Sequence, residues 1–123
     1  MLRLQADSMK AVDTFIRRVV AGGRLWVLDN DGFVAGCSSN HAEDCWVFPV
    51  FSDAALARRG AACWKNRFPP VEVPLATFTD KLLPLYITQG DMVGPNWDGY
   101  MAGSECDPGE MLTRINDALS KAG

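Results

Sequence analysis

The chain has 123 residues, of which 48% are hydrophobic and 22% charged, and its formal net charge is -3. This length and composition fit one globular domain, which is large enough to bury a core without disulfides or metals. The small negative charge, with lysines and arginines scattered along the chain, argues against nucleic-acid binding, because a phosphate backbone attracts clustered cations.

The N-terminal segment MLRLQADSMKAVDTF lacks the apolar core of a signal peptide. No uninterrupted apolar stretch has the length that a membrane span needs. We therefore expect a cytoplasmic protein without membrane contact, whose four cysteines are free thiols.

Apolar residues at helical spacing predict a first helix over about residues 8–21. Asp7 or Ser8 can cap its start, and Gly22 with Gly23 can end it. The stripe that this helix should bury contains Met9, Val12, Phe15, Ile16, Val19 and Val20.

Three strands are predicted next, at residues 25–28, 33–35 and 45–51. Pro49 has no N–H for a sheet ladder, so we expect it at an edge or a bulge. The first and third strands are apolar at consecutive positions, which is typical of a sheet covered on both faces. A helix of this chain or a second copy could provide that cover.

A short helix capped by Ser52 and ended by Gly60 is predicted after these strands. The segment ACWKNRFPP reads as a loop, and residues 71–73 as a short strand.

The next helix begins near residue 75, and Pro84 should kink or break it near Leu83, because proline removes one helical hydrogen bond. Gly90 should end it. We expect strands at residues 91–93 and 100–102, joined by a turn in GPNWDG.

Asp107 should cap the last helix, with Pro108 at its first position and Glu110 at its third. The predicted buried stripe of this helix contains Met111, Leu112, Ile115 and Leu119. The order of elements predicts a single α+β domain over residues 1–123, in which a small antiparallel or mixed sheet of about four to six strands packs with about four helices.

The acidic segment Asp29-Asn30-Asp31-Gly32 resembles part of a calcium loop. When Gly32 is placed at the sixth position of an EF-hand loop, Val27 and Ser38 fall where ligands are needed, and neither supplies them. The segment is therefore predicted to be the turn of a hairpin.

A metal site is one alternative reading of the segment with Cys37, His41 and Cys45, which are spaced four residues apart. Structural zinc sites commonly use ligand pairs two to four residues apart, and no Cys-x-x-Cys pair is present. Ordinary thiols, facing each other across a strand ladder, are the favoured interpretation, and we expect no cofactor.

A small-molecule or metal-dependent enzyme is a second alternative for the same segment. Cys37 or Cys45 would be the nucleophile, His41 the base and Asp44 the group that orients it. The sequence contains no phosphate-binding loop and no nucleophile-elbow motif.

Trp26 and Trp46 lie in predicted strands and are expected in the core, whereas Trp64 and Trp97 lie in predicted loops. A loop tryptophan either anchors a partner or plugs the end of a core. The binding reading gives a surface made of Trp64, Trp97, Asp98 and Tyr100.

The order of several motifs resembles a bacterial family catalogued as domain of unknown function 2750. The motifs are FIRRVVAGGRLWVLDNDGFV, VFPVFSDAALA, VEVPLATFTDKLLP, GDMVGPNWDG and CDPGEML. Phe33 stands where that family is expected to have tryptophan, and the cysteines are not part of its pattern.

The resemblance implies a small α+β domain with no assigned activity. The strand-to-helix junction PVFS is also similar to one in secretion-associated and toxin-immunity proteins. That analogy favours a non-catalytic protein-binding or accessory role, adaptor-like or immunity-like, of a kind that mobile gene cassettes can carry. The expected partner is another protein or a second copy of this chain, and a structural homodimer subunit is a further alternative.

Overall fold

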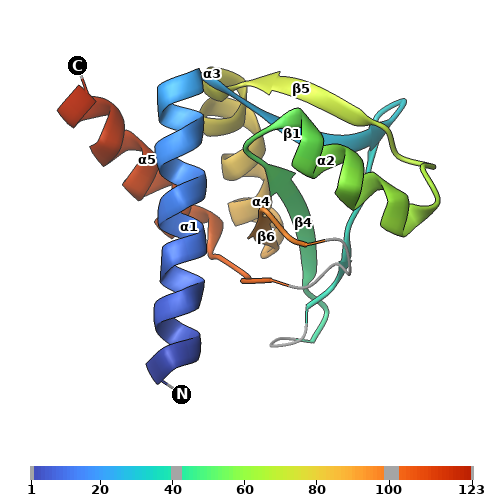
Figure 1. The fold of residues 1–123 in the computed structure, drawn as a ribbon, viewed down its shortest axis with the longest axis horizontal. Coiled ribbons are helices and arrows are strands. Elements are labelled where there is room, and N and C mark those ends of the chain that lie inside the picture. The colour runs from blue at the N-terminus through green and yellow to red at the C-terminus, as the bar shows by residue number, and fades with distance from the viewer. Residues whose placement is uncertain (1, 40–42, 99–102, 123) are drawn as a thin grey trace.

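A six-stranded mixed sheet with helices on both faces forms the fold (Figure 1). The structure, a computed structural model, describes residues 2–39, 43–98 and 103–122. The strands are β1 (Arg24–Asn30), β2 (Phe33–Val34), β3 (Cys37–Ser38), β4 (Trp46–Phe51), β5 (Pro70–Pro74) and β6 (Met92–Pro95). The predicted α+β class is confirmed.

The helices are α1 (Leu2–Gly22), α2 (Ala54–Ala61), α3 (Leu75–Thr77), α4 (Leu83–Gln89) and α5 (Pro108–Ala122). A 3₁₀ turn, η1 (Ala62–Trp64), extends α2, and a π-helical turn, η2 (Phe78–Leu82), joins α3 to α4. None of the described helices is long and apolar enough to cross a membrane.

The central strands β1 and β4 each have neighbours along both edges. β5 pairs antiparallel with one edge of β1. The other edge of β1 pairs first with β4 and, further along the strand, with β2. β6 runs parallel to β4 along one edge, while β3 and β1 share the opposite edge. β1 and β4 therefore pair at Trp26–Phe51 and Val27–Val50 and then diverge, and the β2–β3 segment lies between them.

Pro49 lies inside an interior strand, so the edge position predicted for this end of the strand is wrong. One side of β4 pairs with β6 continuously, and Pro49 is opposite Gly94 there. On the other side, β3 pairs up to Val47 and β1 pairs from Val50. The proline therefore sits at the change of neighbour, where a missing N–H is tolerated.

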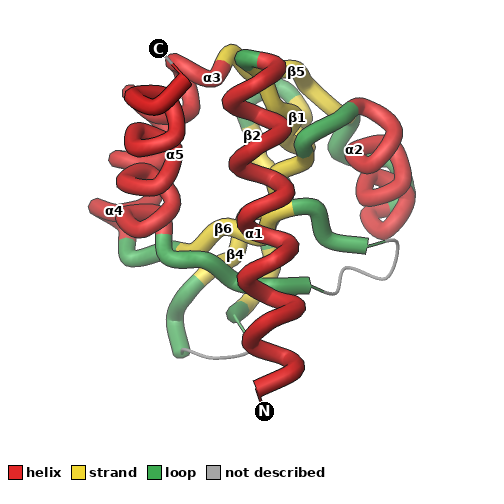
Figure 2. The backbone as a smooth tube through the Cα atoms, turned by 60° about the vertical axis from the view of Figure 1, so that its left-hand side comes forward, coloured by secondary structure: helices red, strands yellow, loops and turns green. Residues whose placement is uncertain are grey.

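Helices of this chain cover both faces of the sheet. Leu25 and Val27 of β1 point into one core cluster together with residues of α1, α4 and α5. Leu28, of the opposite parity, belongs to a second cluster with Phe51 and Ala57 of α2. Figure 2 shows α2 on the opposite side of the strands from α4 and α5. The consecutive apolar residues of β1 thus reflect two covered faces, as expected.

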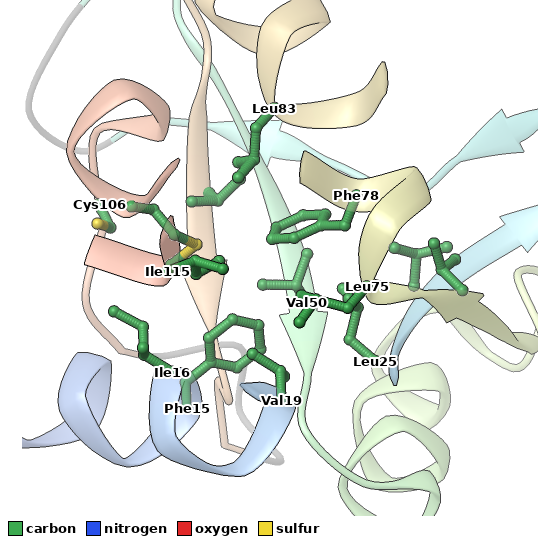
Figure 3. Packing of buried hydrophobic residues seen from close by; sticks show 14 of the residues in the cluster. Phe15, Ile16, Val19, Leu25, Val50, Leu75, Phe78, Leu83, Cys106 and Ile115 are labelled. Carbon is green, nitrogen blue, oxygen red and sulfur yellow. The ribbon is translucent and has the colours of Figure 1, made fainter. Parts of the chain in front are cut away.

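The main core lies between the sheet and the helices α1, α3, α4 and α5 (Figure 3). Phe15 of α1 meets Phe78 of η2 edge to face, with ring centroids 6.5 Å apart. Both rings are fully buried, as are Val19, Leu83 and Ile115. A cluster of this kind holds the helices in place mainly through removal of apolar surface from water.

The hairpin between β1 and β2 confirms the turn reading of the acidic segment. Asn30 pairs with Phe33, so Asp31 and Gly32 form a two-residue loop, with φ angles of 53° and 94°. Positive φ at both positions defines a type I′ turn, which asparagine, aspartate and glycine adopt most easily. The Asp29 carboxylate accepts a hydrogen bond from the Gly32 amide at 2.8 Å, so its role here is local.

The start of α1 differs from the prediction. The helix begins at Leu2 and passes through Asp7 and Ser8, so neither residue is the cap. Its end is as expected, because the Gly23 amide donates to the Val19 carbonyl and the chain leaves the helix there.

The predicted cap and end of α2 are both wrong by a short distance. Asp53, not Ser52, accepts the hydrogen bond from the Leu56 amide, at 2.8 Å. Gly60 lies inside the helix, where a Cβ atom would come within 2.5 Å of the Phe51 ring. This glycine therefore serves the close approach of α2 to the sheet rather than helix termination.

The interruption predicted at Pro84 takes the form of the π-helical turn η2. Proline at the start of α4 lacks the N–H that would bond to the preceding turn, and the regular helical hydrogen bonding is interrupted directly before it. α4 ends at Gly90, whose φ is 75°, as predicted.

The last helix begins as the sequence predicts. Asp107 accepts a hydrogen bond from the Glu110 amide at 2.9 Å, and Pro108 is the first helical residue. Met111 and Ile115 are buried and Leu112 packs against the same core, but Leu119 is 39% exposed, so the predicted stripe is buried only in part. β3 was not predicted, and the strand expected at residues 100–102 lies outside the described residues.

Candidate functional site

Trp97, one of the two tryptophans of the predicted binding surface, is buried against Gly94 and Gly103. It is 4% exposed. Its indole packs so closely on Gly94 and Gly103 that a Cβ atom at either position would overlap the ring. Its Nε1–H donates to the Ser104 carbonyl at 2.8 Å. These contacts favour the interpretation that Trp97 fills the end of the core over the interpretation that it anchors a partner.

The residue before Trp97 ties the same loop to the sheet. Asn96 has a left-handed backbone with φ 49°. Its amide donates to the Val50 carbonyl, its Oδ1 accepts from the Ser52 amide, and its Nδ2 donates to the Ser52 hydroxyl. The segment GPNW is therefore a rigid clasp between β4 and β6.

The other residues of the predicted surface do not gather around Trp97. Trp64 ends the turn after α2, is half-buried, and meets Phe68 edge to face at 6.5 Å. Asp98 is exposed beside the clasp. Tyr100 lies outside the described residues.

Trp46 is 52% exposed, so its predicted core position is wrong. It is the first residue of β4 and pairs with Ser38 of β3. Its side chain shares one face of β4 with that of Phe48, because alternate residues of a strand point the same way. Both rings line an open pocket.

This aromatic pocket, defined by Trp46, Phe48, Trp64 and Phe68 with their neighbours, has a volume of about 570 Å³. It lies where β1 and β4 diverge, since its wall includes the β2–β3 segment Val34, Ala35 and Gly36. The remaining described residues of its lining are Asp44, Gln89 and Asp91.

Gly36 lets the Phe48 ring lie against the pocket wall. A Cβ atom at this position would come within 2.9 Å of the ring and 3.2 Å of the Val47 carbonyl. On its other side Phe48 stacks on Tyr86 of α4, with centroids 4.8 Å apart and planes 11° apart. The ring is therefore fixed from two sides.

The C-terminus of α4 positions an acidic group in the pocket. Gly90 adopts the left-handed conformation and the Asp91 amide donates to the Tyr86 carbonyl, as in a Schellman cap. Asp91 is 8% exposed, and its Oδ1 accepts from the Trp46 amide at 3.2 Å. Asp44, the second carboxylate of the lining, is exposed.

The segment proposed as a metal or catalytic site has thiols that favour the protonated state. Cys37 pairs with Val47, and the Ser39 amide donates to the Cys45 carbonyl, so the two cysteines are offset rather than directly opposite. Partial burial, followed by the charge of Glu105, raises the pKa of Cys37. Burial and then Asp91 and Glu105 raise the pKa of Cys45, against a lowering hydrogen bond from Ser39.

Raised pKa values reduce the thiolate fraction that a nucleophile or a metal ligand needs. Cys63 is exposed and Cys106 is buried. Among the described residues, no three histidine, cysteine, aspartate or glutamate side chains gather as metal ligands would. His41 lies outside the part of the chain that the structure describes, so the predicted triad with Asp44 is not placed.

A second cavity, of about 680 Å³, lies between α1 and α5. Its apolar floor includes Ile16 and Val20, and its rim carries both signs of charge. An ion pair between Asp13 of α1 and Arg114 of α5 joins the two helices across it. This cavity is a helix–helix groove with partly matched charges.

Of the residues that line the pocket, Trp64 was predicted from the sequence as a binding residue, whereas Trp46, Phe48, Phe68 and Asp91 were not. The alternation Trp46–Phe48 was a usable signal, because it places two rings on the same strand face. Asp91 gave no such signal, since its position depends on where α4 ends and β6 begins.

Comparison with known families gives one match. The family model described as protein of unknown function, DUF2750, matches residues 12–115, which is most of the chain. No curated protein and no solved structure matches the chain.

Proposed function

The chain belongs to the DUF2750 family, whose description assigns no activity, and we propose from its site that it is a non-catalytic protein-binding domain. The observation that carries this proposal is the gathering of four aromatic side chains around one open pocket. Open apolar pockets with a few polar groups are the usual place for ligands, and tryptophan is enriched at binding hot spots. We place the binding surface here rather than at Trp97.

Trp46 is the anchor in this proposal because it is large, more than half exposed and attached to a strand rather than a mobile loop. Aromatic anchors inside a polar rim contribute most of the free energy of many protein interfaces. Asp44 and Gln89 supply that rim. An adaptor-like or immunity-like role in a bacterial cytoplasm suits such a domain.

The test compares capture of proteins from an extract of the source cells by the wild type and two matched variants. Trp46→Ala removes the anchor, while Phe33→Ala removes an aromatic ring that is 74% exposed and outside the pocket. We expect capture to fall at least tenfold with Trp46→Ala and to persist with Phe33→Ala, at unchanged thermal stability. Equal capture by all three proteins would remove the support for this surface.

Sedimentation velocity of the same three proteins determines whether the partner is a second copy. A dimer of the wild type that dissociates with Trp46→Ala and not with Phe33→Ala places self-association at the pocket. A monomer in every case leaves a different protein as the proposed partner.

A further inference from the structure

The described lining of the aromatic pocket contains two carboxylates, Asp44 and Asp91, and no basic side chain. Neither carboxylate belongs to an ion pair within the described residues. Only 8% of the Asp91 surface is exposed, so this residue is 92% buried. Its Oδ1 accepts a hydrogen bond from the backbone amide of Trp46, which is neutral. Burial of a carboxylate without a cation is unfavourable, so a cation that enters the pocket would relieve it.

The aromatic walls favour a cation as well. The face of an indole ring carries negative electrostatic potential, which attracts ammonium and guanidinium groups, and tryptophan does so most strongly. Trp46 and Trp64 both line the pocket. Apolar walls and negative charge together match a side chain that has a long apolar stem and a cationic end.

The same combination already holds an arginine elsewhere in this protein. The Arg24 guanidinium lies 5.4 Å from the centroid of Trp26, and it pairs with the Glu72 carboxylate at 3.1 Å. That arginine is satisfied by its own chain. The aromatic pocket offers the corresponding indole and carboxylate, with no cation of the described chain between them.

We propose that the group accepted by the aromatic pocket is a basic side chain, lysine or arginine, of the partner protein. This inference rests on the proposed function and specifies the chemistry of the partner. The cation lies against the indole of Trp46 or Trp64 and opposite the Asp91 carboxylate. The pocket volume of about 570 Å³ exceeds one side chain, so neighbouring residues of the partner enter with it.

The test uses four blocked tripeptides whose central residue is arginine, lysine, citrulline or norleucine. Citrulline and norleucine are neutral residues of similar shape to arginine and lysine. Binding is followed by NMR through the indole N–H signals of Trp46 and Trp64. We expect the basic peptides to bind about tenfold more tightly than their neutral counterparts, which corresponds to the strength of a partly desolvated cation–π contact.

Two matched variants separate the pocket charge from the overall charge. Asp91→Asn keeps an acceptor for the Trp46 amide and removes the negative charge, while Asp80→Asn removes an exposed charge outside the pocket. We expect Asp91→Asn to abolish the preference for basic peptides and Asp80→Asn to preserve it.

Each result supports or overturns the inference. Equal binding of citrulline and arginine peptides would overturn the cation specificity and leave the pocket as a binding site. An equal effect of both asparagine variants would assign the preference to the overall charge and overturn it too. If none of the four peptides moves the two indole signals, the inference fails, and partner capture with Trp46→Ala still decides the proposed function separately.

Discussion

Replacement of Tyr86 by phenylalanine should stabilise the protein, because it removes a buried hydroxyl that has no hydrogen-bond partner in the described structure. Tyr86 is 3% exposed, and its ring stacks on Phe48. Phenylalanine retains that stack and the apolar burial. An unsatisfied buried polar group costs roughly 1–3 kcal/mol, so we expect a gain of about 1 kcal/mol in the free energy of unfolding at pH 7.

Ionisation of Tyr86 at high pH predicts a second, independent change in the free energy of unfolding. Burial, with the charges of Asp91 and Asp29, raises the pKa of Tyr86 to about 12. An unfolded tyrosine has a pKa of about 10, so above pH 10 the unfolded chain loses this proton while folded Tyr86 still holds it. The free energy of unfolding is therefore unaffected by this group below pH 10 and falls as the pH rises toward 12. At pH 11 the wild type should have lost about 1.4 kcal/mol that Tyr86→Phe does not lose.

Urea unfolding followed by tryptophan fluorescence measures both effects. The difference between the two proteins at pH 7 and at pH 11 isolates Tyr86. Other groups that titrate in this range are common to both proteins, including Cys106, whose pKa is raised to about 11 by burial and then by Glu110 and Asp107. A variant less stable than the wild type at pH 7 would show that the hydroxyl has a partner, and an unchanged difference at pH 11 would refute the titration argument.

Three further substitutions test the structural roles assigned above. Trp97→Ala should lower the free energy of unfolding by about 3–5 kcal/mol in urea, because a buried plug leaves a cavity. Gly60→Ala should lower it by roughly 1–3 kcal/mol despite better helix propensity, since the added methyl group meets the Phe51 ring. Asp107→Ala should lower it by about 1 kcal/mol through loss of the α5 cap, with a matching loss of helical circular dichroism on mild heating.

Each of these substitutions has an informative opposite result. A loss below about 1 kcal/mol for Trp97→Ala would return this side chain to the list of surface anchors. Stabilisation by Gly60→Ala would mean that α2 can move away from the sheet. Asp107→Asn is the matched control for the cap, because asparagine also accepts the Glu110 amide hydrogen and should keep most of the stability.

The local signals in the sequence were sufficient for most elements. The Asp31-Gly32 turn, the caps at Gly90 and Asp107 and the break before Pro84 all depend on residues within one turn of the affected backbone. Such preferences act over a few residues, so they can be read without the fold. One error came from two competing local signals, Ser52 and Asp53 at the start of α2.

The candidate site was predictable to a smaller extent. Trp64 and Trp97 carried the same signal, a tryptophan between polar residues in a loop. The structure separates them, because Gly94 and Gly103 provide a slot for one indole and not for the other. The apolar run of its strand predicts a core position for Trp46, yet Trp46 is the first residue of β4 and is 52% exposed there.

By itself the sequence determined the α+β class, the burial of both faces of the sheet at β1, and the assignment of the acidic segment as a hairpin turn rather than a calcium loop. These properties follow from periodicity and from backbone preferences, which are short-range. Only the tertiary structure decided that α2 covers the second face, that β1 and β4 diverge, and that Trp46, Trp64 and Asp91 meet there. Their meeting depends on contacts between residues up to 45 positions apart, such as Asp91 with Trp46, and no local preference encodes such a contact.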